Sequence, residues 1–347
     1  MADNSSVNFK DFIAAYKDRV YEKVCEYMPT GEPRLFNESM VRCYVDRRGQ
    51  YRRPSYVLLW TKLYNGSIDD AMLPAAAQQA SEDYFLMHDD WMDGNSVRRG
   101  GPAAHVLYDP AYVINAGSVV HMAAWKMAKE ACDALGGERG KRYFAKFYDI
   151  MLVTHQGQYL DVRLTKEVKD ITKFTLEDYY ASIHAKSAYY SVYGPMQCGA
   201  IIAGADKDIV DMIPEYGTPC GNAFQIKDDI LDCSSTVDVL GKSIGTDVRA
   251  GTKTIILWHA VQNASSSVLG RLKMIYSKRS SEKTDDDIRF VLDTFRELGS
   301  VGYAQKEADR LVTEASGKFE ALTKSIPESQ FKVIARDAIG VTAKRNV

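Results

Sequence analysis

The sequence predicts an all-α protein that forms a single domain over residues 1–347. Apolar side chains recur at the three- and four-residue spacing of a helix through most of the chain. No stretch shows a convincing alternation of apolar and polar residues, which is the pattern of a half-buried strand. The breaks between the helical patterns are short groups of Gly, Pro and polar residues. None of these breaks is long enough to predict a linker between two domains.

The expected helices can be followed in order along the chain. The first apolar stripe runs from Phe9 to Tyr27 and ends at Pro29-Thr30-Gly31. The last stripe runs from Ala304 to Leu322 and stops before Pro327, because proline cannot continue a helix. Between these two stripes the periodicity predicts helices around residues 55–65, 70–93, 112–134, 141–161, 176–204, 206–232, 253–277 and 285–298.

The composition narrows the class of protein. The chain is 46% hydrophobic and 26% charged with a formal net charge of −2, so no basic excess predicts a nucleic-acid or anionic-membrane partner. Its 6 cysteines are scattered without a CxxC pair, which favours buried thiols over disulfides or zinc ligands. The N-terminus is polar and acidic, and no long apolar run follows it. We therefore expect a cytoplasmic enzyme without a membrane span.

Two nine-residue segments share one template. Residues 85–93 and 224–232 both read F-x-x-x-D-D-x-x-D. On a helix, residues four apart project from the same face, so Asp89 lies beside Asp93 and Asp228 lies beside Asp232. Together with Asp90 and Asp229, these carboxylates would repel one another unless a cation lay between them. The pattern predicts a site for Mg²⁺, which in proteins shares its oxygen shell with substrate phosphates.

Two other interpretations of these segments fit less well. A solvated acidic helix face would have polar neighbours, but apolar residues such as Leu86, Trp91 and Ile230 flank the aspartates. A calcium-binding EF-hand loop that began at Asp89 would place Trp91 and Gly100 at positions that need oxygen ligands. A doubled metal and phosphate site is therefore the favoured interpretation.

Basic residues follow both acidic segments. Arg98-Arg99-Gly100 comes after the first, and Lys242 and Lys253 come after the second. Lys186-Ser187 lies in a predicted helix that is otherwise rich in Tyr and small residues. A single basic residue is more often a solvated surface charge. The recurrence of such residues after both acidic segments favours binding of a diphosphate.

Aromatic residues near these segments predict a pocket for a hydrocarbon. Aromatic faces stabilise cations when water is excluded, although each ring is equally well explained by core packing. A diphosphate at the mouth of an aromatic pocket suggests a prenyl diphosphate substrate, which ionises to an allylic cation. The candidate pocket residues are Tyr84, Phe85, Trp91, Tyr189, Tyr190, Tyr193 and Phe224.

With these residues identified, the chain resembles the trans-isoprenyl diphosphate synthase family from about residue 40 to the C-terminus. The first aspartate motif of that family and its trailing Arg-Arg-Gly are similar to residues 89–100. Its G-Q-x-L-D segment is similar to residues 157–161, and its Lys-Thr pair to Lys186-Ser187. Its second aspartate motif is similar to residues 224–232, and its G-K-x-x-G-[TS]-D segment to residues 241–247.

The resemblance implies a fold, a cofactor and a set of roles. The implied fold is the all-α class I isoprenoid synthase bundle around a central cavity, usually as a homodimer. The implied catalytic residues are Asp89, Asp90, Asp93, Arg98, Lys186, Asp228, Asp229, Asp232 and Lys242, and the six aspartates would bind Mg²⁺, with three ions expected. The implied substrate-binding residues are Tyr84, Phe85, Arg99, Gln158, Ser187, Tyr193, Phe224, Gln225 and Lys253.

The chain departs from the family where a second diphosphate, that of isopentenyl diphosphate, would bind. The G-G-K-x-x-R segment of coupling enzymes is similar to residues 48–53, with Arg53 kept and Gln50 at the Lys position. Glu82 stands where the family has His or Gln, and Lys253 is shifted by one residue. A carboxylate ~4 Å from a diphosphate would cost on the order of 1–4 kcal/mol. The loss of a Lys at position 50 and the gain of a carboxylate at Glu82 therefore both disfavour binding of the second diphosphate.

These departures give a leading hypothesis and two alternatives. The leading hypothesis is a sesquiterpene synthase, similar to the insect-type terpene synthases that arose within this family. Tyr84 and Phe85 are bulky, as in farnesyl-making members, so farnesyl diphosphate is the expected substrate and geranyl diphosphate the second choice. The first alternative is a working farnesyl or geranyl diphosphate synthase in which Arg47, Arg48 or Arg52 replaces the missing Lys. The second is a silent regulatory subunit of an active synthase.

Overall fold

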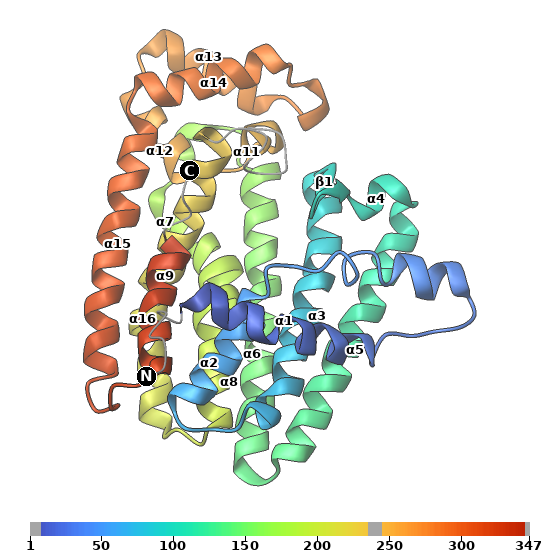
Figure 1. Cartoon of the computed structure of the whole chain (residues 1–347). Helices are drawn as coiled ribbons and strands as arrows, with labels where there is room; N and C mark the ends of the chain where they lie inside the picture. Colours follow the sequence, from blue (N-terminus) through green and yellow to red (C-terminus); the bar gives the residue numbers. More distant parts are fainter. Residues whose placement is uncertain (1–7, 235–244, 344–347) are drawn as a thin grey trace.

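The computed structural model describes residues 8–234 and 245–343, and these fold almost entirely into helices (Figure 1). The predicted all-α fold is confirmed. Within those ranges a single small hairpin interrupts the helices, where β1 (Val97–Arg98) pairs antiparallel with β2 (Gly101–Pro102). The sequence analysis did not predict this hairpin, because two-residue strands are too short for an alternating pattern.

The first half of the chain supplies one side of a helical bundle. Its helices are α1 (Phe9–Cys25), the π-helix η1 (Leu35–Met40), α2 (Arg52–Leu63), α3 (Ile68–Asp93), α4 (Ala104–Leu107), α5 (Pro110–Leu135) and α6 (Gly137–Lys166). The second half begins with the 3₁₀-helix η2 (Ile171–Lys173), α7 (Leu176–Ile183), the π-helix η3 (His184–Tyr193), α8 (Gly194–Ile202) and α9 (Lys207–Ser234). It ends with α11 (Thr246–Ala250), α12 (Ile255–Asn263), α13 (Ser266–Ser277), the 3₁₀-helix η4 (Ser280–Glu282), α14 (Asp285–Glu297), α15 (Ser300–Leu322) and α16 (Gln330–Ala343).

Local sequence explains where the long helices begin and end. The Ser67 side chain accepts a hydrogen bond from the backbone N–H of Asp69 and so caps the start of α3. At the other end of α3, Gly94 has a φ of 72°, a left-handed conformation that glycine adopts without steric cost. Helix α5 starts with the N-cap Asp109 followed by Pro110, and α7 starts with a capping box between Thr175 and Asp178.

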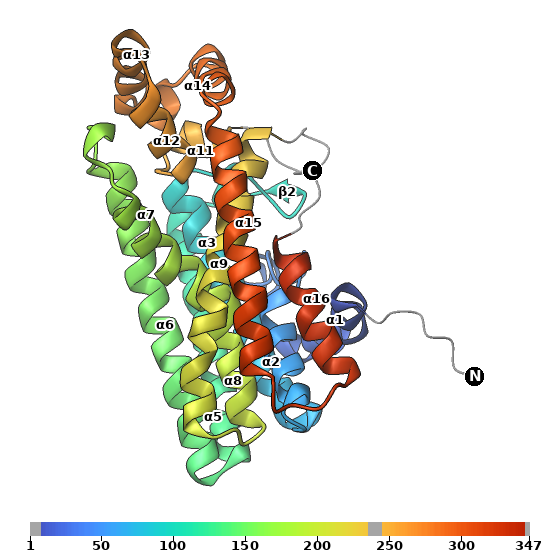
Figure 2. The ribbon, with the colours of Figure 1, turned by 90° about the vertical axis from the view of Figure 1, so that its left-hand side faces the viewer.

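The long helices run roughly parallel and enclose the centre of the bundle, while α13 and α14 lie across one end (Figure 1). Helix α3 packs along α2 and α5, and α9 packs along α15 and η3. Figure 2 shows α1 and α16 side by side, so the two ends of the described chain lie on one face. The two helices with aspartate motifs, α3 and α9, thus belong to opposite sides of the bundle interior.

The buried apolar residues form two clusters that meet along α9. The larger cluster includes Trp60 of α2, Phe147 of α6 and Tyr216 from the first half of α9. The smaller cluster includes Ile226 from the second half of α9 and Phe295 of α14. Because α9 is buried in both clusters, its aspartate motif is fixed to the two packed units at once.

Three differences from the predicted helices have clear causes. The region 176–204 is helical but comprises α7, η3 and α8, with a π-helix in the middle. The region 253–277 is divided into α12 and α13, because the Ser265 side chain caps a new helix start. Helix α16, beyond Pro327, was not predicted.

Within the described ranges, no helix combines the length and apolar character needed to cross a bilayer.

Candidate active site

One cavity of about 700 Å³ lies at the centre of the bundle and gathers most of the predicted site residues. Residues from α3, α6, η3, α9 and the chain after α11 line it. The predicted site residues on its wall are Phe85, Asp89, Asp93, Arg98, Arg99, Gln158, Lys186, Ser187, Phe224, Gln225, Asp228, Asp229 and Lys253. Residues of both aspartate motifs therefore face one cavity.

Asp89 is held by two side chains from across the cavity. The amide of Gln158 donates to its Oδ1 at 2.7 Å, and the ammonium of Lys186 donates to the same atom at 2.9 Å. Lys186 also donates to Asp161 at 2.6 Å. Burial opposes the charged forms, yet Lys186 lowers the pKa of Asp89, while Asp161 and Asp89 raise the pKa of Lys186 well above its usual value. Lys186 is thus a charged donor placed at the aspartate motif.

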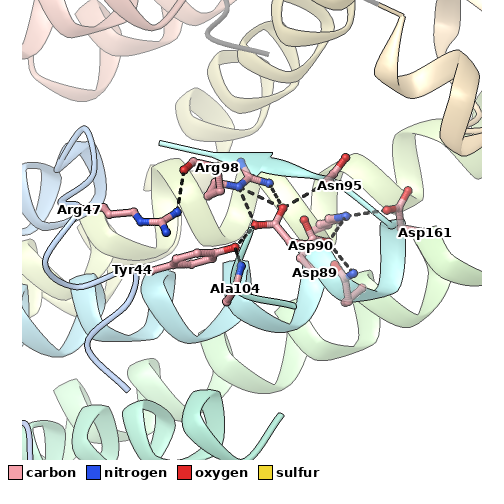
Figure 3. A network of polar contacts seen from close by, with 10 residues as sticks. Tyr44, Arg47, Asp89, Asp90, Asn95, Arg98, Ala104 and Asp161 are labelled. Atoms are coloured by element: carbon pink, nitrogen blue, oxygen red, sulfur yellow. Dashed lines mark hydrogen bonds and ion pairs between the residues drawn. The ribbon is translucent and has the colours of Figure 1, made fainter. Parts of the chain in front are cut away.

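Asp90 is bound by protein groups and does not line the cavity (Figure 3). Its carboxylate accepts a hydrogen bond from the Tyr44 hydroxyl at 2.7 Å, and the Arg98 guanidinium donates to it through Nε at 2.9 Å and Nη2 at 2.5 Å. Asp90 is fully buried. It was predicted to be a metal ligand, but in this structure it orients Arg98, and its role as a ligand stays a prediction.

The second aspartate motif is divided in the same way. Asp228 and Asp229 line the cavity, whereas Asp232 accepts hydrogen bonds from the backbone N–H groups of Thr246 at 3.2 Å and Asp247 at 3.0 Å. Asp229 accepts from the Tyr179 hydroxyl at 2.7 Å, and burial raises the pKa of Asp229 to about 7. In each motif, therefore, one aspartate (Asp90 or Asp232) binds protein groups, and the other two aspartates line the cavity.

A wide helical turn presents Lys186. This residue lies in the π-helix η3, a form of helix that is often found at functional sites. Helix α6 approaches η3 closely at Gly157, where an added Cβ would lie 2.4 Å from the backbone N of Lys186 and 2.7 Å from the carbonyl carbon of Ala185. Glycine at 157 therefore allows the contact that sets the position of Lys186.

We expect Gly157→Ala to lower both stability and activity. The new methyl group would meet rigid backbone, so overpacking should cost about 1–3 kcal/mol and move Lys186 away from Asp89. The melting temperature should fall by several degrees, since about 1 kcal/mol corresponds to ~2–4 °C in a chain of this size. The control is Gly270→Ala in α13, where an added Cβ meets nothing within 4 Å. Equal melting temperatures for the two variants would contradict this prediction.

The acidic side of the cavity has the chemistry of a site for a hard divalent cation. Asp89, Asp93 and Asp228 offer carboxylate oxygens, the ligands that Mg²⁺ prefers. Burial and the neighbouring Asp89 raise the pKa of Asp93 well above its usual value, so an added positive charge would relieve its desolvation and repulsion. In the described part of the chain, no three potential ligands already form a cluster that could hold a metal. The carboxylate oxygens of Asp89, Asp93 and Asp228 fit ions that also bind substrate phosphates.

The opposite wall carries arginines paired with carboxylates. Arg53 and Arg99 approach Oε1 of Glu82 at 3.0 and 3.6 Å, and Arg99 also donates to Asp83 at 2.7 Å. Burial opposes ionisation, but Arg53 and Arg99 lower the pKa of Glu82. Glu82 is therefore an anion between Arg53, which was expected to bind the second diphosphate, and Arg99, which was expected to bind substrate.

The three arginines that were proposed to replace the missing Lys make different contacts. Arg47 donates to the backbone carbonyl of Pro102 at 2.6 Å, and Arg48 pairs with Asp18 at 2.7 Å. These two arginines are used to hold the hairpin and α1. Arg52 lines the cavity with Gln50, and its guanidinium lies 5.3 Å from the centre of the Phe224 ring. All three arginines line the cavity, so each stays a candidate substitute.

Lys253 lines the cavity, and its ammonium group also contacts protein groups. Its ammonium donates to the backbone carbonyl of Gly251 at 2.8 Å and lies 5.4 Å from the centre of the Tyr276 ring. Burial, together with the nearby Lys283, lowers the pKa of Lys253 to about 7. A bound anion would favour its charged form.

Several predicted residues lie away from the cavity wall. Trp91 is 43% exposed, and Tyr84, Tyr189 and Tyr193 pack behind the lining residues, whereas Tyr190 lines the cavity. Trp91 fails as a pocket residue because it lies on the outward face of α3. Lys242 lies outside the described residues, so its role stays a prediction.

The sequence analysis did not select some residues that complete the site. Asp161 shares Lys186 with Asp89, and Tyr44 holds Asp90 from a segment far away in sequence. Asp161 could have been found, because it follows Gln158 by three residues on one helix and so shares its face. Tyr44 carried no such signal, since its contact depends on tertiary packing.

Comparison with known proteins gives a consistent set of relatives. Residues 35–294 match the family model described as Polyprenyl synthetase. The chain is 29% identical to the short chain isoprenyl diphosphate synthase of Methanothermobacter thermautotrophicus, over 94% of this chain and 96% of that protein. It superposes on geranylgeranyl pyrophosphate synthetase from Pyrococcus horikoshii with a TM-score of 0.84 and 28% identity, covering 97% and 99% of the two chains.

A third similarity concerns the fold alone. Geranylgeranyl pyrophosphate synthase from Corynebacterium glutamicum, solved with isoprenyl diphosphate and magnesium, superposes with a TM-score of 0.85 at 22% identity, covering 98% of this chain and all of that chain (100%). These three relatives are named for prenyl diphosphate synthesis. The family model and the first two relatives support the predicted family and favour the prenyltransferase alternative over the expected likeness to terpene synthases.

Proposed function

The chain belongs to the polyprenyl synthetase family, and from that premise we propose that it is a Mg²⁺-dependent prenyltransferase that extends an allylic diphosphate with isopentenyl diphosphate. One observation carries the proposal: a single cavity is lined by two separate groups of charged side chains, and we assign each group to one diphosphate. The first comprises Asp89, Asp228 and Lys186, and the second is the wall with Arg53 and Arg99. A coupling enzyme must hold two diphosphates, whereas a cyclase needs to hold one.

In the proposed reaction the allylic carbon–oxygen bond breaks and a carbon–carbon bond forms to the isopentenyl double bond. A proton then passes from the new carbocation to the released diphosphate, which restores a double bond. Lys186 and Arg98 donate hydrogen bonds to the departing diphosphate, and Arg98 is held ready for this by Asp90. The chemistry that Mg²⁺ supplies when bound, in our proposal as three ions, is neutralisation of the diphosphate as negative charge develops on it.

The cavity wall supports a short product. Phe85 lines the cavity, and its ring centre lies 5.0 Å from that of Tyr190, so two aromatic rings narrow this end. We propose farnesyl diphosphate, with 15 carbons, as the main product, in keeping with the bulky pair Tyr84-Phe85. The prenyl chain would lie among apolar side chains, where burial is worth roughly 25 cal/mol per Å² of apolar surface.

A sesquiterpene synthase is the second candidate function. It is favoured by the position of Glu82, whose ionised carboxylate lies at 3.0 Å from Arg53 and 3.6 Å from Arg99. These ion pairs neutralise part of the wall that would bind isopentenyl diphosphate. An enzyme that ionises farnesyl diphosphate alone would not need that wall.

The deciding experiment uses purified protein with Mg²⁺ and three substrate sets: geranyl diphosphate with labelled isopentenyl diphosphate, farnesyl diphosphate alone, and farnesyl diphosphate with labelled isopentenyl diphosphate. Products are resolved by chromatography with mass detection, before and after phosphatase treatment. Labelled longer diphosphates that disappear on chelation of Mg²⁺ support the prenyltransferase. A hydrocarbon or alcohol from farnesyl diphosphate alone, with no label incorporated, supports the terpene synthase. No product in any set would favour a silent subunit.

We also propose that the chain forms a homodimer through α5 and α6. Met122 of α5 is 67% exposed, and Tyr148 and Leu152 of α6 are also exposed. The Trp125 and Tyr148 ring centres lie 6.1 Å apart, so the exposed faces of the two helices are continuous. Large apolar surfaces of this kind usually mark interfaces.

The dimer proposal predicts that Met122→Glu with Leu152→Glu gives a monomer. Two buried, unpaired carboxylates at a self-complementary contact should shift the equilibrium by at least tenfold toward the monomer. Light scattering coupled to gel filtration measures the mass of each species. Met274→Glu is the control, because Met274 is also exposed but lies in α13. Equal masses for wild type and the double variant would contradict the proposed interface.

A further inference from the structure

A layer of Tyr and His residues lies behind Phe85, on the side away from the cavity. Tyr84 comes from α3, His121 and Trp125 from α5, and His155 from α6. Tyr84 does not line the cavity, and neither histidine does. The layer therefore packs against the lining residue Phe85, between three helices.

For neutral rings, the hydrogen bonds indicate which nitrogen of each histidine carries the hydrogen. Nδ1 of His155 lies 2.6 Å from the carbonyl O of Met151, which only accepts, so this nitrogen carries the hydrogen. The Nε2 atom of His155 is then an acceptor, and the Tyr84 hydroxyl donates to it at 2.7 Å. His121 Nε2 lies 2.7 Å from the indole N–H of Trp125, a group that only donates, so His121 Nε2 is also an acceptor.

Ring contacts join this layer to the cavity wall. The His121 ring stacks on Tyr84 with centres 4.3 Å apart and planes at 9°. His155 contacts Phe85 as well, with ring centres 4.8 Å apart. Both rings of the Tyr84-Phe85 pair thus depend on His155 for their positions, and through it on α6.

We propose that the hydrogen bond between Tyr84 and His155 is the latch that closes the hydrocarbon end of the pocket, and that His155 is a specificity-determining residue. This inference rests on the proposed function, because chain length is a property of the coupling reaction. If the pocket were closed by the bulk of side chains alone, Tyr84→Phe would leave the product unchanged, since the ring stays. With the latch, loss of one hydroxyl separates α3 from α6 and leaves the Nε2 of the half-buried His155 without its donor.

The test compares Tyr84→Phe and His155→Leu with a matched control, His259→Leu. His259 is also a histidine stacked on a tyrosine, Tyr303, with ring centres 4.4 Å apart, but it lies in α12. Each protein is incubated with Mg²⁺, geranyl diphosphate and labelled isopentenyl diphosphate, and the C20 to C15 product ratio is measured. Both latch variants are expected to raise this ratio at least tenfold, and the control should leave it unchanged. An unchanged ratio in Tyr84→Phe, with activity within twofold of wild type, would overturn the latch.

A binding measurement separates this inference from the proposed function. If wild type couples no isopentenyl diphosphate, the prenyltransferase proposal fails, and the latch is then judged by affinity. Unreactive thiolodiphosphate analogues of the C15 and C20 chains are titrated with Mg²⁺ into wild type and Tyr84→Phe. A tenfold gain in relative affinity for the C20 analogue supports the latch, and an unchanged relative affinity overturns it. If His155→Leu fails to fold, as judged by circular dichroism, Tyr84→Phe alone decides, because it removes a single oxygen.

Discussion

Asp89→Ala and Asp228→Ala are each expected to lower turnover by roughly 10³-fold or more, because each removes a carboxylate that faces the shared cavity. The allylic diphosphate would then lose both cation binding and alignment. The measurement is the rate of diphosphate release at saturating Mg²⁺. This prediction holds for both candidate functions, since each begins with cleavage of the same carbon–oxygen bond.

The fold of these variants should remain intact. Lys186 keeps Asp161 as a partner at 2.6 Å when Asp89 is removed, so no buried cation is left unpaired. Circular dichroism should therefore match wild type. The control is Asp211→Ala, which removes a surface carboxylate paired with Lys207 in α9. Near wild-type turnover in either cavity variant would refute the assignment of the acidic surface.

The second large effect is expected at the arginine wall. Glu82→His combined with Gln50→Lys should lower the KM for isopentenyl diphosphate at least tenfold. The double change removes an anion and adds a cation near Arg53 and Arg99. A charge at about 4 Å is worth on the order of 1–4 kcal/mol, and ~1.4 kcal/mol corresponds to tenfold in affinity.

Glu82→Gln distinguishes the effect of the negative charge at position 82 from the effect of side-chain size. It keeps the size of the side chain and removes its negative charge, so it should give part of the gain. Glu138→Gln is the control, because Glu138 is an exposed residue paired with Lys141. If the KM for isopentenyl diphosphate is the same in wild type, the double variant, Glu82→Gln and Glu138→Gln, Glu82 does not limit binding of isopentenyl diphosphate. Coupling that appears in the double variant but is absent from wild type would instead favour the terpene synthase for the natural sequence.

Much of the fold could be predicted, because helices carry their own periodic signal. The stripe from Phe9 to Tyr27 is α1, and the long patterns at 70–93 and 112–134 are α3 and α5. Helix α16 was missed because Pro327 was taken as the end of the last helix. Its buried residues Ile334, Ala335, Ala338 and Ile339 do follow helical spacing, so a search beyond the proline could have found it.

The sequence predicted the residue types of the site, but it did not predict which aspartates line the cavity and which bind protein groups. Spacing placed the aspartates of each motif on one helix face, and in the structure residues of both motifs line one cavity. Spacing did not indicate that Asp90 and Asp232 bind protein. Asp90 is reached by Arg98 through the β1–β2 hairpin, where Arg99 and Gly100 have φ values of 51° and 73°. Such a turn, like the pairing of Glu82 with Arg53, depends on tertiary contacts that no local pattern encodes.

The internal ion pairs have a consequence for handling the protein. Lys186 already neutralises part of Asp89, and Arg98 does the same for Asp90. These counter-charges belong to the chain, so the acidic surface does not require a metal ion in order to fold, unlike the thiolates of a structural zinc site. Chelation of Mg²⁺ should therefore inactivate the enzyme without unfolding it. A preparation stripped with a chelator, stored, and then returned to Mg²⁺ should recover its full activity.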